Sequence, residues 1–196
     1  MAVHLDGEFA FGLALIHALW LKIGQTLTDA QIEELKAADT LEKARVRAVD
    51  FIGYRPRSVA EVRRRLTRAG VDEENIAQIV ANLRDAGLLD DASFSKEWVE
   101  SRLRSAPKSR RMMAWELRQK GVAQGVIDET LQAADVDDAQ TAQDMARRRL
   151  PRLASADALT KKRKLSEYLA RNGFDYAIIS EAVAAVLTQD SSSTEE

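Results

Sequence analysis

The sequence predicts a mainly α-helical protein, with three tandem three-helix repeats after a short N-terminal segment of hairpin and helix. Three observations indicate this fold class. The 196-residue chain is 31% charged but only 6% aromatic, whereas β proteins draw heavily on aromatic and β-branched residues. Three prolines and nine glycines leave long uninterrupted stretches in which helices can form. The third observation is an internal repeat of about fifty residues.

The repeat is marked by Gly70, Gly121 and Gly173, which lie 51 and 52 residues apart. Apolar residues recur four and eight residues before each glycine, directly after it, and six and ten residues after it. This pattern predicts two helices per copy, with a glycine at the left-handed turn between them. The column residues are Leu66, Leu117 and Leu169; Val62, Met113 and Leu165; Val71, Val122 and Phe174; Ile76, Ile127 and Ile179; and Val80, Leu131 and Val183.

Residues 1–40 are predicted to form a separate N-terminal segment. The pair Asp6-Gly7 separates two short apolar stretches and indicates a β-hairpin, because Gly tolerates the positive φ of a type I′ turn. Residues 13–23 are largely apolar and should form a helix. A capping box at Thr28 opens a further helix, which should end near Ala38.

Each repeat should begin with a linking helix, and the three linking helices are predicted at 41–54, 92–105 and about 137–150. Asp39 and Asp91 are the expected caps of the first two, and Pro151 should end the third. A capping box at Ser58 starts the next helix of the first repeat. The predicted divisions are therefore 1–40 for the N-terminal segment, 41–90, 91–135 and 136–188 for the repeats, and 189–196 for a polar, disordered tail.

Composition excludes several classes of site. Without cysteine there is no disulfide framework and no thiolate metal site, and the reducing cytoplasm is the expected location. The apolar run at 13–21, which closes at Lys22, is shorter than the ~20 residues that span a bilayer, so no membrane segment is expected. No Ser-His-acid set, phosphate-binding loop or metal-spaced cluster occurs, so the sequence predicts no enzyme activity and no cofactor.

Some single residues have both a chemical and a structural interpretation. The pair Asp90-Asp91 could hold a metal, but capping a helix after a turn is the favoured role. Trp98 and Trp115 lie at helical spacing with other apolar residues and are expected in the core. His17, on an apolar face, is interpreted as a packed side chain rather than a ligand.

Basic residues form three clusters, while acidic residues gather elsewhere in each repeat. A basic stripe suits a phosphate backbone or an acidic protein groove. The structural alternative is that the surfaces of helices are charged in any case. Like charges held together repel, which favours a binding role for the clusters as groups. The predicted partner-binding residues are Arg55, Arg57, Arg63, Arg64, Arg65, Arg68, Arg104, Lys108, Arg110, Arg111, Arg118, Lys161, Lys162 and Arg163.

Three stretches of the chain, in this order, resemble the RecX regulators of the RecA recombinase. They are Tyr54-Arg55-Pro56-Arg57-Ser58 with Glu61 and Leu66, Gly87-Leu88-Leu89-Asp90-Asp91 with Phe94, and Leu117-Arg118-Gln119-Lys120-Gly121-Val122. The resemblance spans roughly residues 41–187. It implies an elongated, curved stack of three three-helix modules that lies along a RecA–DNA filament. It also implies a role in DNA repair, recombination and the SOS response.

Two main hypotheses of function follow. In the first, the chain is a non-catalytic, monomeric regulator that binds RecA filaments. It modulates their recombinase and ATPase activity, with inhibition as the favoured direction. Contacts between the basic stripe and single- or double-stranded DNA are an open alternative within this hypothesis. In the second, a helix pair with a Gly turn acts as a helix–turn–helix directly on DNA, which predicts sequence preference on naked duplex. A repeat scaffold for another partner is a third class.

Overall fold

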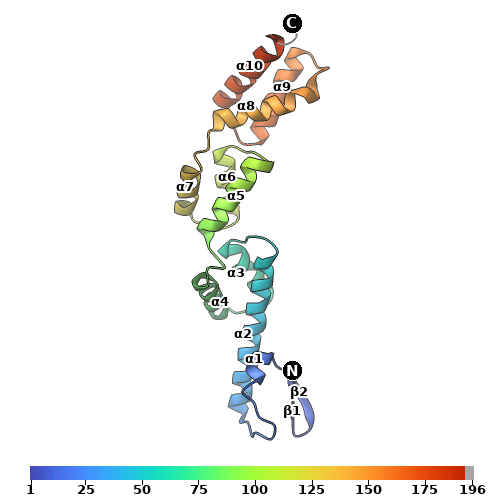
Figure 1. Ribbon diagram of the computed structural model, residues 1–196, viewed down its shortest axis with the longest axis vertical. Helices are drawn as coiled ribbons and strands as arrows, with labels where there is room; N and C mark the ends of the chain where they lie inside the picture. The colour runs from blue at the N-terminus through green and yellow to red at the C-terminus, as the bar shows by residue number, and fades with distance from the viewer. Residues whose placement is uncertain (193–196) are drawn as a thin grey trace. The chain divides into compact units, whose positions relative to one another are not determined.

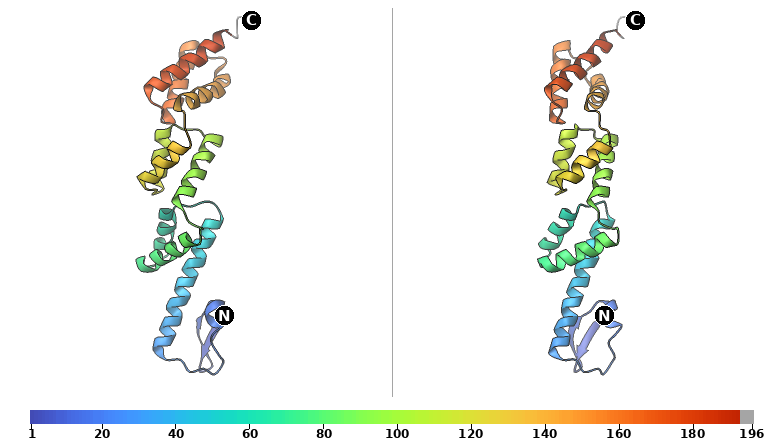
Figure 2. Two further views of the ribbon diagram at one scale, coloured as in Figure 1. Left: turned by 60° about the vertical axis from the view of Figure 1, so that its left-hand side comes forward. Right: turned by 90° about the vertical axis from the view of Figure 1, so that its left-hand side faces the viewer.

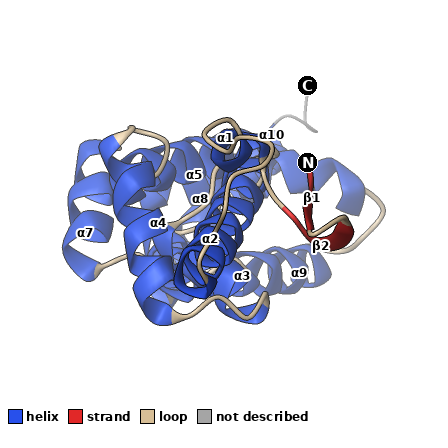
Figure 3. Ribbon diagram, turned by 90° about the horizontal axis from the view of Figure 1, so that it is seen from below, coloured by secondary structure: helices blue, strands red, loops and turns tan. Residues whose placement is uncertain are grey.

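The structure, a computed structural model, describes the backbone of residues 1–192 and the side chains of residues 1–190. The chain divides into two compact units, Met1–Leu89 and Asp90–Glu196. The first unit holds β1 (Ala2–Leu5), β2 (Glu8–Gly12), α1 (Leu15–Ala18), α2 (Asp29–Gly53), α3 (Val59–Arg68) and α4 (Glu73–Asp85) (Figure 1). The second holds α5 (Asp91–Ser105), α6 (Arg110–Gln119), α7 (Gln124–Ala133), α8 (Asp138–Arg149), the 3-10 helix η1 (Leu150–Leu153), α9 (Ala158–Arg171) and α10 (Tyr176–Ser192). The predicted class, mainly α with an N-terminal hairpin, is confirmed (Figure 3).

The N-terminal hairpin forms at the turn that the sequence predicts. Strands β1 and β2 pair antiparallel, with an irregularity in register between Val3 and His4. The turn residues Asp6 and Gly7 have φ of 52° and 88°, the positive values that a type I′ turn requires. The amino group of Met1 donates to the Leu13 carbonyl oxygen at 2.6 Å, which fixes the start of β1 beside the end of β2.

The helix predicted over 13–23 is wrong in extent, because only Leu15–Ala18 forms a helical turn, α1. Short helices are marginal in water unless tertiary packing buries their apolar face. Here Leu13 is buried, but the large apolar side chains of Ile16, Leu19, Trp20 and Ile23 stay exposed. The helix therefore lacks the packing that would extend it beyond one turn.

The predicted break near Ala38 is also wrong, because α2 runs unbroken through it (Figure 2). Asp39 does not cap a helix but lies buried within α2, where its Oδ1 accepts a hydrogen bond from the Ala14 amide at 2.6 Å. Its other oxygen forms an ion pair with Lys43. The carboxylate that the local sequence predicts to cap a helix therefore accepts instead from Ala14, 25 residues away in sequence.

Asp39→Ala should lower the free energy of unfolding of the first unit by about 1–3 kcal/mol, the cost of leaving the Ala14 amide without its acceptor. Burial raises the pKa of the Asp39 carboxyl, but the hydrogen bonds from Lys43 and Ala14 outweigh it, so the pKa is lowered from 3.8. The stabilisation is therefore complete above pH 3.8 and is lost as the pH falls through the folded-state pKa. Urea unfolding at neutral and acid pH measures both effects.

Asp50→Ala is the matched control, because Asp50 is an exposed aspartate on the same helix. Its removal should change the free energy of unfolding by less than about 0.5 kcal/mol. Equal costs for the two substitutions at neutral pH would show that the Asp39 carboxylate does not anchor the N-terminal segment.

The apolar columns of the sequence form the cores of the three repeats. Of the fifteen column residues, all are buried except Val71, which is half-buried, so the prediction that the columns are core is confirmed. Each repeat has its own hydrophobic cluster, around Leu66, Leu117 and Leu169 respectively. The linking helices α2, α5 and α8 contribute further buried residues to these clusters.

The glycine turns explain why two of the columns exist. Gly70, Gly121 and Gly173 have φ of 79°, 83° and 91°, as predicted. In the first turn the Val71 amide donates to the Leu66 carbonyl oxygen at 3.2 Å, and the same bond joins the matching residues of the other two turns. In this Schellman motif the two bonded residues also make an apolar contact, which accounts for apolar residues at both positions.

The third repeat departs from the other two at its ends. Helix α9 has 14 residues against 10 in α3 and α6, because its cap, Asp157, comes one turn earlier relative to the glycine. Pro151 has no amide hydrogen to donate, and α8 gives way there to η1, whose Leu153 enters the core. The disordered tail predicted from 189 begins too early, since α10 continues to Ser192; residues 193–196 lie outside the described residues.

Candidate functional site

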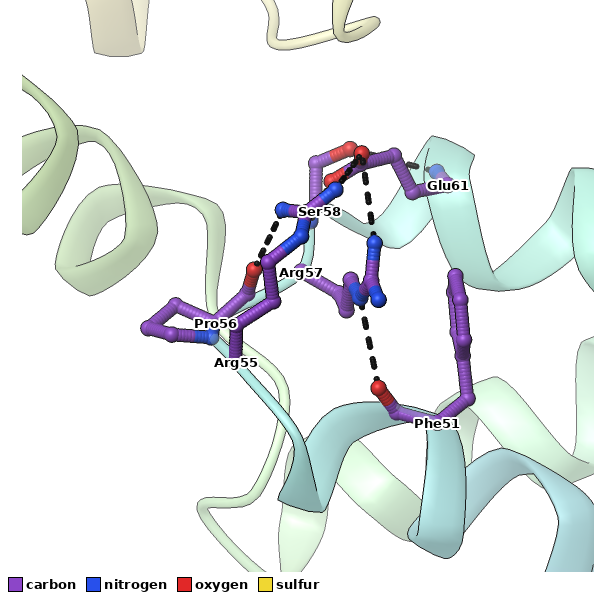
Figure 4. Close-up of polar contacts among 6 residues, drawn as sticks. All are labelled: Phe51, Arg55, Pro56, Arg57, Ser58 and Glu61. Carbon is purple, nitrogen blue, oxygen red and sulfur yellow. Dashed lines mark hydrogen bonds and ion pairs between the residues drawn. The ribbon is translucent and has the colours of Figure 1, made fainter.

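The first candidate site is the corner between α2 and α3, which contains Arg55 and Arg57 (Figure 4). Pro56 disfavours helical backbone at Arg55, and α2 ends at Gly53. Ser58 then caps α3: its hydroxyl accepts from the Glu61 amide at 3.1 Å, and the Glu61 carboxylate accepts from the Ser58 amide at 3.2 Å. This reciprocal capping box places a carboxylate at the centre of the corner.

Both arginines of the corner turn toward that carboxylate. Arg55 donates from Nη2 to Glu61 Oε1 at 2.9 Å, and Arg57 Nη1 lies 4.0 Å from the same oxygen. The Arg57 guanidinium stacks over the Phe51 ring at 3.8 Å and donates from Nε to the Phe51 carbonyl oxygen at 3.2 Å. With 15% of its side chain exposed, Arg57 joins the end of α2 to the start of α3.

The residues of this corner also shift the pKa of Arg57. Burial lowers the pKa of the Arg57 guanidinium, as does the neighbouring Arg55, while Glu61 raises it. Arginine stays protonated in proteins even when its pKa falls, so the side chain remains a cation held against an aromatic ring and a carboxylate. Electrostatic contacts within the first repeat therefore hold this corner together.

The remaining predicted residues of the first repeat lie on α3. Arg63 forms an ion pair with Glu73, and the exposed Arg65 lies 5.9 Å from the Phe51 ring. Arg64 and Arg68 are exposed and form no ion pair with any residue that the structure describes. Because they are four residues apart on one helix, these two cations share a face.

The second group of predicted residues divides in the same way. Lys108 lies 3.5 Å from Glu116, and Arg118 donates to the Gln124 side chain at 3.2 Å. The backbone amide of Arg110 donates to Asp138 at 2.7 Å. Within residues 1–190, Arg104 and Arg111 have no ion-pair partner, and both are exposed.

In the third repeat two of the three predicted cations are paired within the chain. Lys161 contacts Asp190 at 2.7 Å and Arg163 contacts Glu167 at 3.4 Å, whereas Lys162 is exposed and has no described carboxylate within ion-pair distance. Among the predicted residues, the exposed cations whose side chains form no ion pair, hydrogen bond or ring contact with any described residue are called here the outward cations. They are Arg64, Arg68, Arg104, Arg110, Arg111 and Lys162.

Comparison with known proteins identifies the family to which this three-repeat architecture belongs. Family models describing RecX match the chain in order: its first three-helix domain at residues 44–83, the second at 90–131 and the third at 135–183. The chain belongs to the RecX family. The resemblance inferred from the sequence motifs is thus confirmed.

Individual RecX proteins agree with this assignment. "Regulatory protein RecX" of Oceanobacillus iheyensis is 30% identical over 195 residues, which cover 97% of this chain and 72% of the relative. The protein of the same name from Prosthecochloris aestuarii is 34% identical over 146 residues, covering 74% of this chain and 95% of the relative. A crystal structure of regulatory protein RecX has a TM-score of 0.70 at 25% identity, covering 91% of this chain and 92% of that one.

The second stretch of RecX resemblance also serves local folding. Gly87 has a φ of 68° and ends α4, and Leu89 is buried. Asp90, rather than Asp91 as predicted, caps α5, since its carboxylate accepts from the Ser93 amide at 2.8 Å. Asp91 is the first helical residue, so the helix begins one residue earlier than the sequence indicated.

A polar network in the second RecX repeat was missed from the sequence. Glu116 accepts from Trp98 Nε1 at 3.1 Å and from Arg102 Nε at 2.7 Å, and it also faces Lys108. The Trp98 ring is in turn contacted by Arg102 and Lys120, at 4.4 and 4.1 Å. The i,i+4 spacing of Trp98 and Arg102 on one helix face was the available signal.

The expectation that Trp115 is core is wrong. Helix α6 buries Met113 and Leu117, which lie one turn apart, and Trp115 falls midway between them on the opposite side of the helix. Its side chain is 52% exposed. Trp98, by contrast, is half-buried against the second core, in agreement with its prediction.

The described residues hold neither a membrane-spanning helix nor a metal-binding cluster. Residues 1–192 contain no helix with the length and hydropathy of a membrane span. The part of the chain that the structure describes likewise holds no group of three His, Cys, Asp or Glu side chains arranged to bind a metal.

Proposed function

We propose that this RecX-family chain is a non-catalytic, monomeric, cytoplasmic regulator that binds RecA nucleoprotein filaments and inhibits their recombinase and ATPase activity. The observation that carries the proposal is the division of its cations. The contact between Arg57 and Glu61 and the network around Glu116 hold helices together. The side chains of the outward cations form no such contact with the described residues. Cations without an internal partner are available to the carboxylates and phosphates of a nucleoprotein surface.

The spread of these cations over all three repeats supports a multivalent mode of binding. Arg64 and Arg68 lie on α3, Arg104 on α5, Arg110 and Arg111 on α6, and Lys162 on α9. An exposed ion pair contributes only about 0–1 kcal/mol, so no single contact would hold a partner. Several weak contacts to a repeating filament bind together by raising one another's effective concentration.

In the first repeat, the helix–turn–helix alternative is disfavoured by the charge of the second helix, α4. In that mode the second helix of the pair enters the major groove with its N-terminal residues on the bases. Helix α4 begins with Glu73 and Glu74 after the cap Asp72, which would repel phosphates. Apart from Arg104 on the linking helix α5, the outward cations lie on the first helices of the pairs, away from where base reading requires them.

The test is the single-strand-dependent ATPase of RecA titrated with this chain. We expect the rate to fall and then level off as the filament saturates. An unchanged rate at saturating chain would overturn the proposal. A parallel titration of naked duplex identifies the alternative, which predicts sequence preference and a salt slope near ~−0.9 per phosphate contact.

A further inference from the structure

Helix α6 carries an exposed tryptophan between two arginines. Trp115 lies four residues after Arg111 and three residues before Arg118, so the three side chains share the outer face of the helix. The arginines are about 10.5 Å apart along the helix axis, at 1.5 Å per residue. The indole lies in the gap between two positive charges.

The two large aromatic side chains of this repeat are in opposite states. Arg102 and Lys120 cover the ring of Trp98, and Glu116 accepts its Nε1 hydrogen. For Trp115, no cation among the described residues lies over the ring, and half of the side chain is open. The indole face of Trp115 is therefore free to stack.

The charge around Trp115 is positive on the outer side. Glu116 is the one acidic residue of α6, and it turns inward to Trp98, Arg102 and Lys108. Arg118 donates a hydrogen bond to Gln124, and Gln124 in turn donates one to Asp128. No carboxylate among the described residues therefore neutralises the charge of Arg118 directly. Arg111 is one of the outward cations.

The other repeats lack this combination. At the position of Trp115 the first repeat has Arg64 and the third has Glu167. At the positions of Arg111 and Arg118, the first repeat has Ala60 and Thr67, and the third has Arg163 and Ala170. The aromatic residue flanked by two arginines is a feature of the second repeat.

We propose that the Arg111–Trp115–Arg118 face of α6 binds single-stranded nucleic acid, with one unstacked base on the indole and the flanking phosphates on the two guanidinium groups. Sequence-tolerant binding of single strands combines these two elements: an aromatic platform and adjacent cations. A duplex offers phosphates but keeps its bases stacked on each other. This assignment deepens the proposed function, on which it rests for the single strand that a RecA filament carries.

A protein partner fits this face less well. Aromatic anchors of protein interfaces lie in desolvated pockets within a ring of packed residues. The exposed neighbours of Trp115 on α6 are Arg111, Arg118 and Gln119, all polar. Charge and stacking are both matched by a polynucleotide.

The experiment measures binding of the full chain to fluorescein-labelled oligo(dT) by anisotropy, without RecA. Trp115→Ala should weaken binding by about 5- to 150-fold, the effect of losing one stacked base, whereas Trp115→Phe should retain most of the affinity. Binding to a duplex of the same length should not respond to either change. Arg111→Ala should lower the magnitude of the salt slope by about 0.7, the value for one single-strand phosphate.

Trp20→Ala is the matched control, because Trp20 is also an exposed tryptophan but lies in the other unit. It should leave oligo(dT) affinity unchanged. Wild-type oligo(dT) affinity in Trp115→Ala would overturn the assignment, and so would equal losses of affinity for single strand and duplex. Loss of RecA binding with unchanged oligo(dT) affinity would also overturn it, because that result would identify a protein-docking face. If Trp115→Ala misfolds, Trp115→Phe and Arg111→Ala decide instead. Trp115-dependent binding with an unaffected RecA ATPase would leave this site standing and remove the proposed function.

Discussion

Leu117→Ala should lower the free energy of unfolding of the Asp90–Glu196 unit by about 2–5 kcal/mol. The Leu117 side chain is fully buried and packs in a cluster with Met113 and Ile127. Truncation removes its transfer free energy and leaves a cavity that three packed helices can only partly close. Urea unfolding followed by far-ultraviolet circular dichroism measures the loss.

Leu159→Ala is the matched control for this core truncation. Leu159 lies in the same unit, in the first turn of α9, and is 77% exposed. The same chemical change should therefore cost less than about 0.5 kcal/mol. Equal midpoints for the two variants would show that the repeated leucine column does not form the core.

Gly173→Ala should cost a similar amount, about 2–5 kcal/mol, for a different reason. Gly173 has a φ of 91°, at which an L-residue is strained by about 1–2 kcal/mol. An added Cβ would also lie 2.7 Å from both Met112 Cβ and Ser109 Oγ. Overpacking of this kind costs about 1–3 kcal/mol more, because the start of α6 must move.

Gly70→Ala separates strain from crowding. Gly70 occupies the same turn of the first repeat, with a φ of 79°, but no described atom lies within 4 Å of an added Cβ. Its substitution should cost only the backbone strain, about 1–2 kcal/mol. Each variant is measured by urea unfolding of its own unit. Equal costs at the two glycines would contradict the close approach of the second and third repeats at Gly173.

The repeat was predictable because its signals are local. A Schellman turn needs glycine at one position and apolar residues at two fixed offsets, so three copies of the turn produce columns that can be read without a structure. Ser58 and Thr28 cap helices as predicted, since a capping box is complete within four residues. Interactions within one turn of helix are encoded in adjacent residues.

What sequence could not supply depends on partners distant in the chain. Asp39 looks like a cap until the Ala14 amide, 25 residues earlier, takes its carboxylate. Arg57 and Arg64 look alike in a basic run, yet one stacks on Phe51 beside Glu61 and the other stays exposed. Trp115 and Trp98 likewise differ only in which side of their helix faces the core. The division between structural and outward cations emerges only from folding.

That division is the central claim, and filament binding by charge-reversed variants tests it most directly. Arg64→Glu with Arg68→Glu should weaken binding to RecA filaments at least roughly tenfold, because like charges placed against a partner cost several kcal/mol. Lys22→Glu with Arg84→Glu, two exposed cations of the same unit outside the predicted set, makes the same change in net charge and should bind as wild type. Both doubles should keep the wild-type unfolding midpoint. Equal filament affinity for the two double variants would contradict the claim.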